Sequence, residues 1–343
     1  MKKVSIVSVK RPSNAGGAEI VWENLKKQGM KFDNVSLDTA DLPKRFRLIP
    51  NAFHLKEIFA SKWLMKKALA KRTEVMIYDK IFGWLDIETD TKEICYNHGS
   101  YTIAGLTFKD KNYLIYLIYK YVLSYFERKS YENADKIIAV SESVKDEMVD
   151  YFGIPSRKIV VVDNAVDLKK FRPMKNKDTL KKKFGLPVNK KIIFFPGRAS
   201  FGKGFDIAEK VLKELGDDYF MFVLGEGKSE LDNVKFIGKI SNDKMVEVYN
   251  CADLCLFPSR YEGGSISVLE SAACGVPLVL SGVGLMKTEK GMKEFVCGSV
   301  DEYVSKVKNI DLDSSSRKWR EFVKGFSIEK QVRELGGILG NEE

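Results

Sequence analysis

The chain has 343 residues, of which 44% are hydrophobic, and its net charge is +10. Its length favours two domains with buried cores, and no stretch is long and apolar enough to predict a membrane-spanning helix. The positive charge favours anionic partners in general, which include nucleic acid, acidic lipid and phosphorylated small molecules. The five cysteines are scattered, mostly in apolar runs, which favours buried free thiols over disulfides or metal ligands.

The chain begins with an apolar run over residues 4–9, which is too short for a secretory signal and predicts a buried strand. Gly16 and Gly17 follow, ahead of a stretch with helical periodicity. A glycine pair between a strand and a helix lets backbone amides approach a phosphate at the helix N-terminus. A tight turn with Ser13 or Asn14 near the helix cap accounts for the same residues equally well.

Residues 44–72 form a strongly basic segment, with nine basic residues against one acidic residue, Glu57. Aromatic residues such as Phe59 and Trp63 are interleaved with the cations. A segment of this composition can lie on an anionic membrane surface. A helix that packs by its apolar face and exposes its lysines to solvent is the alternative interpretation.

Two further strands are predicted at residues 74–79 and 93–97, and His98 follows the second. A histidine at the end of a strand and ahead of a glycine is well placed to contact a ligand. A buried structural histidine is the other interpretation, because His98 has no recognisable partner nearby in the sequence.

A tyrosine-rich helix is predicted over residues 112–134, followed by a strand at 136–140 and a helix at 141–151 that begins with Ser141 as its cap. The polar, lysine-rich residues 174–183 are then the best candidate for a linker between domains.

A second series of alternating strands and helices begins after this segment. Two such series predict two parallel-sheet domains that face each other. The predicted elements of the second series are strands at 191–195, 219–224, 234–237, 254–257 and 277–280, and helices at 205–215, 241–251 and 265–274.

A Gly-rich loop follows the strand at 191–195 and carries two cations, Arg198 and Lys203. Residues 197–203 fit the phosphate-binding pattern G-x-x-x-x-G-K, but Gly204 stands where that pattern needs Ser or Thr to hold magnesium. A phosphate-loop ATPase is therefore an alternative that lacks the magnesium-binding hydroxyl of this pattern. Gly225-Glu-Gly227 lacks the third glycine of a dinucleotide-binding fingerprint, so a nicotinamide cofactor is poorly supported.

The stretch from residue 254 to 282 is predicted to run strand, Gly-rich loop, helix, strand. Ligands bind outside the carboxyl ends of parallel strands, so the loop, with Glu262 inside it, is a predicted ligand site. Glu270 lies on the helix and has two interpretations. If the helix began at Ser267, Glu270 would complete a capping box; if Ser265 is the cap, Glu270 projects from the second turn.

These features together resemble the retaining glycosyltransferases of family 4, which have the GT-B fold: α/β, with two facing Rossmann-like domains, parallel sheets and an interdomain cleft. The resemblance follows the order of the family's motifs along nearly the whole chain. The residues that carry it are Gly16-Gly-Ala-Glu19, His98-Gly99, Ala134 to Ser141, Val162 to Asp167 with Phe171 and Pro173, Gly197-Arg198 to Lys203-Gly204, Gly225-Glu-Gly227, and Glu262-Gly263 through Glu270 to Pro277.

The resemblance implies roles for these residues. Arg198 and Lys203 would neutralise the donor diphosphate, Glu262 would hold the transferred sugar, and His98 would lie beside that sugar on the acceptor side; these four are the predicted catalytic residues. Glu270 would bind the ribose hydroxyls. The predicted donor-binding residues are Gly16, Gly17, Gly225, Gly263, Gly264, Ser265, Ile266 and Glu270.

The implied activity is transfer of a hexose with retention, from a UDP- or GDP-sugar to a lipid-linked, polysaccharide or other glycan acceptor. The resemblance implies no metal, no other cofactor and no nucleic-acid partner, and Asp311-Leu-Asp313 is interpreted as a loop instead of a metal site. We expect a cytoplasmic protein, peripheral on the membrane if residues 44–72 bind lipid. The alternatives are a nucleotide-sugar epimerase of the same architecture, a phosphate-loop ATPase and a non-catalytic subunit.

The predicted domains are 1–173 on the acceptor side, 174–325 for the nucleotide sugar, and a C-terminal helix at 326–343 that crosses back to the first domain as in the family. One departure from the family concerns the loop that usually runs Glu-Gly-Phe-Gly. It is Glu262-Gly-Gly-Ser265 here, which predicts a differently shaped sugar pocket.

Overall fold

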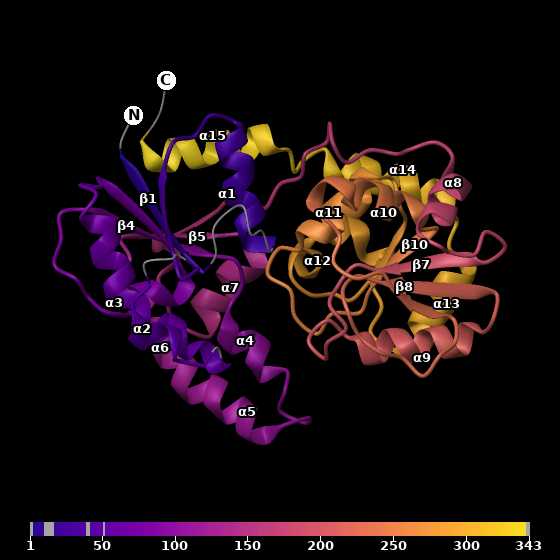
Figure 1. The fold of residues 1–343 in the computed structure, drawn as a ribbon, viewed down its shortest axis with the longest axis horizontal. Coiled ribbons are helices and arrows are strands. Elements are labelled where there is room, and N and C mark those ends of the chain that lie inside the picture. Colours follow the sequence, from indigo (N-terminus) through magenta and orange to yellow (C-terminus); the bar gives the residue numbers. More distant parts are fainter. Residues whose placement is uncertain (1–2, 10–16, 39–41, 51, 341–343) are drawn as a thin grey trace. The chain divides into compact units, whose positions relative to one another are not determined.

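A computed structural model describes residues 3–9, 17–38, 42–50 and 52–340, which form two compact units with one sheet each (Figure 1). The first unit comprises the chain up to Asn164 together with the segment from Ile328 onward, and the second comprises Ala165–Ser327. The sequence placed the boundary after residue 173. In the structure the chain changes units earlier, because Val166 and Phe171 are already buried in the core of the second unit.

The sheet of the first unit has six parallel strands in the order β2-β1-β3-β4-β5-β6. Every residue of β1 and β3 is buried, as expected for a sheet covered on both faces. The strands are β1 (Val4–Ser8), β2 (Asp33–Ser36), β3 (Val75–Asp79), β4 (Lys92–Asn97), β5 (Lys136–Ala139) and β6 (Ile159–Val161).

The helices of the first unit include the predicted helix capped by Ser141, whose Oγ accepts a hydrogen bond from the amide of Val144 at 3.3 Å. The C-terminal helix α15 belongs to this unit, where Gln331 Nε2 donates to the carbonyl oxygen of Asp163 at 2.9 Å. The helices are α1 (Gly17–Lys27), α2 (Lys44–Arg47), α3 (Leu55–Leu69), α4 (Tyr101–Leu106), α5 (Tyr113–Leu117), α6 (Ser124–Asn133), α7 (Glu142–Asp150) and α15 (Ile328–Leu339).

The basic segment 44–72 contains α2 and α3. Helix α3 buries its apolar face, including Ile58, Leu64 and Met65, in the first unit. Its lysines lie on the other face, so α3 follows the alternative in which a packed helix exposes its cations. Helix α2 has no buried residue.

The sheet of the second unit has five parallel strands in the order β11-β10-β7-β8-β9. Alternate residues of β7 point to opposite faces: Phe194 packs in one core with Phe222, whereas Ile193 and Phe195 pack in the other with helix α9. The strands are β7 (Lys191–Phe195), β8 (Tyr219–Val223), β9 (Val234–Phe236), β10 (Leu254–Phe257) and β11 (Leu278–Leu280).

The predicted linker at 174–183 is wrong, because residues 177–183 form helix α8. Leu180 is buried in the core of the second unit, and Lys177 and Lys181 each pair with Asp253 at 3.0 Å. A lysine-rich composition here reflects ion pairing at a helix surface. The helices of the second unit are α8 (Lys177–Lys183), α9 (Phe205–Leu215), α10 (Met245–Cys251), α11 (Ile266–Ala273), α12 (Leu285–Thr288), α13 (Val300–Asn309) and α14 (Leu312–Val323).

The interpretation of Asp311-Leu-Asp313 as a loop is also wrong, because these residues begin α14. Asp311 is the N-cap, and its Oδ1 accepts a hydrogen bond from the amide of Ser314 at 2.9 Å. All five cysteines are free and buried, which confirms the prediction of buried thiols. Among the described residues, no helix is both long and apolar enough to cross a bilayer.

Candidate functional site

The loops that carry most of the predicted site residues lie at the switch point of the second sheet. From the central strand β7 the chain runs outward to β8 and β9, and it later returns to add β10 on the other side of β7. Ligands of open parallel sheets bind where the strand order reverses in this way, outside the carboxyl ends of the strands. The loops after β7 and β10 are therefore neighbours at the expected binding position.

Gly204 brings these two loops into close contact. It caps α9 with a φ of +71°, and a Cβ at this position would lie 1.9 Å from the carbonyl oxygen of Pro258. A side chain does not fit there, so neither does the Ser or Thr of a magnesium-binding phosphate loop. The departure from that pattern thus has a steric cause, and the hydroxyl that the ATPase alternative requires is missing.

Lys203 and Glu262 connect the two loops by an ion pair. Lys203 Nζ lies 2.6 Å from Glu262 Oε1, and Ser259 Oγ donates to the same oxygen at 2.7 Å. The lysine side chain is 35% exposed and the glutamate 14%. An ammonium group has three donors, so Lys203 can contact an anionic ligand as well as this carboxylate.

Arg260 is a further residue of the site that sequence reasoning missed. Its guanidinium forms a two-pronged pair with the Asp206 carboxylate at 2.7 Å, donates to the carbonyl oxygen of Phe201 at 2.7 Å, and lies 3.7 Å from the centre of the Phe201 ring. This arrangement ties the loop after β10 to the loop after β7 a second time. In the sequence, Arg260 is notable only because it lies two residues before Glu262. Nothing in the sequence indicates that Asp206 is its partner.

The start of helix α11 lies beside Glu262. The helix begins at Ile266 with Ser265 as its N-cap, and the Ser265 side chain makes no capping hydrogen bond. Gly284 approaches from the loop after β11, where an added Cβ would lie 2.8 Å from the carbonyl oxygen of Glu262. The close approach of this loop was not predicted, because a single glycine after a strand is a common sequence feature.

A small hollow lies under these loops and is lined by Ser259, Glu262, Ser265 and Ser281, with Met286 at its apolar side. Ser281 Oγ donates to the carbonyl oxygen of Ser259 at 2.6 Å. The free volume of about 20 Å³ is room for about one water molecule. The hollow therefore accommodates a hydroxyl-sized group and not a whole sugar ring.

Glu270 does not complete a capping box, because α11 begins at Ile266 and not after Ser267. The Glu270 side chain is buried, and its Oε2 accepts a hydrogen bond from the Tyr249 hydroxyl at 2.7 Å. Burial raises the pKa of the Glu270 carboxyl to about 7, and the Tyr249 hydrogen bond and the Lys170 charge limit the rise. Tyr249, which sequence reasoning did not single out, therefore fixes the orientation of this carboxylate.

The other predicted residues of the second unit are not part of the side-chain pairs that connect the two loops. Arg198 is exposed at the start of the loop after β7, and no ion pair joins it to another described residue. Gly225 has a φ of +92°, and its amide donates to the carbonyl oxygen of Gly238 at 2.9 Å. Gly263 is buried and Gly264 is half-buried, between Glu262 and the helix start.

His98 lies in the first unit, where it belongs to a cluster of buried polar side chains. Its Nε2 is 3.5 Å from Asp79 Oδ1, its ring packs on Tyr96 at a centroid distance of 4.6 Å, and it meets the Trp22 ring edge to face at a centroid distance of 6.2 Å. Four buried atoms of this cluster have no hydrogen-bond partner among the described residues. They are Trp22 Nε1, Asp79 Oδ1, Tyr96 Oη and His98 Nε2.

The position of this polar cluster is again the carboxyl edge of a sheet. Asp79 ends β3, His98 follows β4, and Trp22 lies on α1, which begins at Gly17. Buried atoms without a hydrogen-bond partner are rare in native proteins and often mark a place for a ligand or water. Gly16, predicted to approach a phosphate here, lies outside the described residues.

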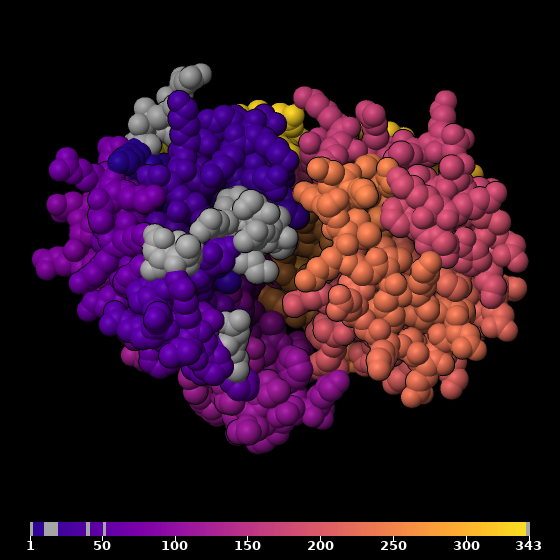
Figure 2. All heavy atoms as spheres, viewed as in Figure 1, coloured from indigo at the N-terminus to yellow at the C-terminus, as the bar shows by residue number. Residues whose placement is uncertain are grey.

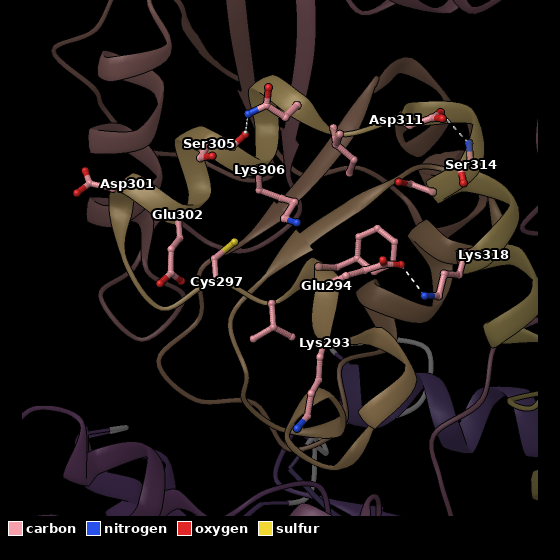
Figure 3. A pocket seen from close by; sticks show the side chains of 15 residues that line it. Lys293, Glu294, Cys297, Asp301, Glu302, Ser305, Lys306, Asp311, Ser314 and Lys318 are labelled. Atoms are coloured by element: carbon pink, nitrogen blue, oxygen red, sulfur yellow. Dashed lines mark hydrogen bonds and ion pairs between the residues drawn. The ribbon is translucent and has the colours of Figure 1, made fainter.

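A larger hollow of about 790 Å³ in the second unit does not contain any predicted site residue (Figure 3). Three of its polar side chains have structural contacts: Lys318 pairs with Glu294 at 2.5 Å, and Asp311 caps α14. Among the described residues, no group of three or more His, Cys, Asp and Glu side chains is arranged to hold a metal ion. The switch-point loops therefore remain the candidate site of this unit.

Two parallel-sheet units, with glycine-rich loops, cations and carboxylates at a switch point, define a GT-B glycosyltransferase as the class of protein. The family model "Glycosyltransferase Family 4" matches residues 16–170, and the model "Glycosyl transferases group 1" matches residues 176–324. The two matches together leave only the ends and a short connection uncovered, and the chain belongs to the family 4 glycosyltransferases.

Among curated relatives, the D-inositol 3-phosphate glycosyltransferase of Mycolicibacterium smegmatis is 30% identical over 174 residues, which are 46% of this chain and 40% of that protein. The alpha-galactosylglucosyldiacylglycerol synthase of Streptococcus pneumoniae is 27% identical over 188 residues, which are 50% of this chain and 49% of that protein. The matched part of the chain thus spans less than half the length of these relatives.

Solved structures agree on the fold over nearly the whole chain. Sucrose-phosphate synthase from Thermosynechococcus elongatus has a TM-score of 0.79 at 17% identity, covering 99% of both chains. The Anabaena protein HepE, in a structure with UDP-glucose, has a TM-score of 0.69 at 13% identity, covering 98% of this chain and all of the other. At such identities the likeness establishes the GT-B fold of two Rossmann-like units.

Proposed function

We propose that the protein transfers a hexose with retention from a nucleotide diphosphate donor, a UDP- or GDP-sugar, to a lipid-linked, polysaccharide or other glycan acceptor. In this reaction the bond between the sugar C1 and the leaving phosphate oxygen breaks, and a bond between C1 and the acceptor oxygen forms on the same face. The acceptor proton passes to the leaving phosphate. We further propose that the reaction needs no metal, because Arg198 and Lys203 supply the positive charge.

The Lys203–Glu262 ion pair is the observation that carries this proposal. A diphosphate bound at the Gly-rich loop would replace Glu262 as the main partner of Lys203, because the phosphate oxygens carry more negative charge than one carboxylate. Glu262 would then be released to accept hydrogen bonds from the sugar hydroxyls. Donor binding and sugar recognition are thereby coupled through one side chain.

Charge develops on the leaving diphosphate as the C1–O bond breaks, and preorganised cations stabilise it more in the transition state than in the ground state. Lys203 is positioned for this role by the loop that Gly204 and Arg260 hold against β10. Arg198 is exposed and forms no ion pair with another described residue. We therefore assign the larger catalytic contribution to Lys203.

Glu270 is assigned to the ribose hydroxyls of the nucleotide. A ribose diol donates two hydrogen bonds, which favours an ionised carboxylate as acceptor. The Tyr249 hydroxyl holds one carboxylate oxygen, Oε2, and leaves Oε1 for the ligand. Because the Glu270 pKa is about 7, binding would improve as the pH rises through this value.

The acceptor is assigned to the first unit, next to His98 and Asp79. The buried atoms of this cluster that have no hydrogen-bond partner among the described residues offer both donors and acceptors to a hydroxyl-rich ligand. Two relatives, an inositol 3-phosphate glycosyltransferase and a diacylglycerol glycolipid synthase by name, support a phosphorylated or lipid-linked acceptor. The HepE structure with UDP-glucose supports a UDP-sugar as the first donor to test.

The proposal is tested by calorimetric titration of UDP and GDP into the purified protein with a chelator present. We expect binding without metal, and we expect Lys203→Ala, Arg198→Ala and Glu270→Ala each to weaken it. Lys210→Ala, which removes an exposed lysine on α9, is the matched control and should bind as the wild type does. Unchanged nucleotide affinity in all three site variants would contradict the assignment.

Glu262→Gln separates donor binding from sugar transfer. Because the substitution removes the competing carboxylate, UDP affinity should stay equal or increase, while transfer from a UDP-sugar falls by about 100-fold or more. A loss of UDP affinity as large as that of Lys203→Ala would argue against the exchange of partners.

An epimerase would convert the UDP-sugar with no acceptor present, whereas a transferase should show only slow hydrolysis.

A further inference from the structure

A continuous helical stretch of the first unit exposes an unusual number of large apolar side chains. It runs through α5, a π-helical segment at Ile118–Leu123 and α6. Five of the nine exposed large hydrophobic residues in the described part of the chain lie on it. They are Tyr113 (61% exposed), Leu114 (68%), Tyr121 (63%), Val122 (45%) and Tyr125 (53%), here called the tyrosine face.

The tyrosine face is separate from the side of the helix that packs into the unit. Leu123, Glu127 and Tyr131 are fully buried on that packed side, where α6 lies against Lys80–Trp84. Leu114, Tyr121 and Tyr125 recur at helical spacing and so share the other side. Figure 1 shows α5 at the end of an arm that projects from the first unit, and Figure 2 shows atoms of the same colour, magenta, at the surface.

Cations surround the tyrosine face. Residues 109–129 contain five basic residues and two acidic ones, and one of the acids, Glu127, is buried. Lys109 and Lys111 are exposed just ahead of α5. Lys120 Nζ lies over two tyrosine rings, 5.5 Å from the centre of Tyr116 and 5.2 Å from that of Tyr121. Aromatic rings and charged groups are thus mixed on one helix side.

We propose that the tyrosine face docks the protein on a membrane that contains anionic phospholipid. Tyrosine rings are enriched at the boundary between headgroups and acyl chains, and lysines can extend from such a face to lipid phosphates. An exposed helix that combines apolar side chains with flanking cations binds in the plane of the interface. A second copy of the chain fits this surface less well, because a symmetric contact would bring like charges together.

Helix α2 of the same unit is also basic and exposed. Lys44, Arg45 and Arg47 are exposed on it, and Leu48 beside them is 83% exposed. The chain then leads to Phe53, whose ring lies 6.3 Å from that of Tyr119 in the π-helical segment. In one of two interpretations the sequence predicted lipid binding by residues 44–72, but α3 buries its apolar face inside the unit. The structure thus moves the apolar contribution to residues 113–125.

The test is co-sedimentation of the full chain with vesicles of phosphatidylcholine alone or mixed with phosphatidylglycerol, at low and high salt, without donor or acceptor. We expect binding to the mixed vesicles, weakened by salt. The variant with Leu114→Ser, Tyr121→Ser and Val122→Ser should bind about tenfold more weakly or worse. The variant with Lys109→Glu, Lys111→Glu and Lys120→Glu should lose the salt-dependent part of binding.

A matched control removes exposed apolar side chains elsewhere. Met174 and Val188 of the second unit are 41% and 45% exposed, and their replacement by Ser should leave vesicle binding unchanged. Thermal unfolding and UDP titration of every variant show whether the fold and the donor site are intact, so failure here is distinguishable from failure of the transferase proposal. Equal vesicle binding by the tyrosine-face variant, no binding by the wild type, or a dimer in solution that this variant abolishes would overturn the proposal.

Discussion

The carboxyl edges of the two sheets differ in how their polar groups are paired. In the second unit, Lys203 is paired with Glu262, Arg260 with Asp206, and Glu270 with Tyr249. At the corresponding edge of the first unit, four buried polar atoms around His98 have no hydrogen-bond partner among the described residues. One edge has its hydrogen bonds and ion pairs in place, while the other has buried donors and acceptors that make no hydrogen bond to a described residue.

This difference bears on how each edge would recognise a ligand. Paired side chains hold their positions before a ligand arrives, which reduces the ordering cost of binding and favours one ligand geometry. Unpaired buried atoms carry a desolvation cost that a ligand can relieve. We expect the loss of a contact at the edge of the second unit to destabilise the protein and the removal of a hydroxyl without a partner in the first unit to stabilise it, and the variants below examine this expectation.

Gly204→Ala should have the largest effect, because it breaks the contact on which the paired edge depends. The alanine Cβ would overlap the carbonyl oxygen of Pro258, and the positive φ adds strain. We expect a loss of about 3 kcal/mol or more in the free energy of unfolding, measured by chemical denaturation. Gly202→Ala in the same loop is the matched control, because an added Cβ there meets no atom within 4 Å. Equal stability of the two variants would contradict the steric account.

Glu270→Gln should change the pH dependence of stability. Burial raises the Glu270 pKa from its usual 4.5 to about 7, so the folded state holds a proton that the unfolded chain releases at lower pH. Wild-type stability therefore decreases as the pH rises from about 4.5 to 7, by on the order of 2–3 kcal/mol from this group, and the glutamine variant lacks this decrease. The gain in Tm of the variant over the wild type should be larger at pH 8 than at pH 5.

Glu93→Gln is the matched variant in the first unit. Burial, with Asp135 and Asp86 nearby, also raises the pKa of Glu93 to about 7, so the same trend in Tm is expected. Only Glu270→Gln should weaken UDP binding. If both variants weaken it, the effect reflects general destabilisation and not contact with the ribose.

The Arg260–Asp206 pair can be measured with a double-mutant cycle. Arg260→Ala, Asp206→Ala and the double variant should give a coupling energy of about 1 kcal/mol, because the pair has two-pronged geometry but is partly exposed. We also expect the KM for the donor to increase in Arg260→Ala, since the two loops lose one of their connections. A coupling energy near zero would show that the loops are held without this pair.

Tyr96→Phe should have the smallest effect on the free energy of unfolding, and in contrast to Gly204→Ala it should stabilise the protein. Removing a buried hydroxyl that has no partner among the described residues is expected to stabilise the protein by about 1 kcal/mol or less. Calorimetric unfolding measures this directly. A destabilised variant would mean that the hydroxyl has a partner in solution, such as an ordered water.

Much of the fold follows from local patterns in the sequence. The buried runs that became β1, β7 and β10 could be predicted because each is a short apolar stretch that ends at a turn signal. Lys203 and Glu262 could be connected through the resemblance to a family, which implies contacts between distant residues. Periodicity alone contains no such information.

The residues that were missed owe their roles to contacts between distant parts of the chain. Tyr249 and Glu270 come from different helices, and Asp206 meets Arg260 only after the two loops pack. The linker prediction failed for the same reason. Lys177 and Lys181 look like solvated linker residues until Asp253, which follows α10, is placed beside them.

The five buried cysteines have a practical consequence for labelling. Burial raises the pKa of Cys297 to about 11 and of Cys251 and Cys255 to about 12, and it raises those of Cys95 and Cys274 as well. Thiolates are the reactive species, so at neutral pH all five should resist maleimide reagents in the folded protein. The native cysteines should therefore not react when a fluorophore is attached to an added, exposed cysteine. One cysteine added to each unit would report distance changes during a catalytic cycle, with no native thiol replaced.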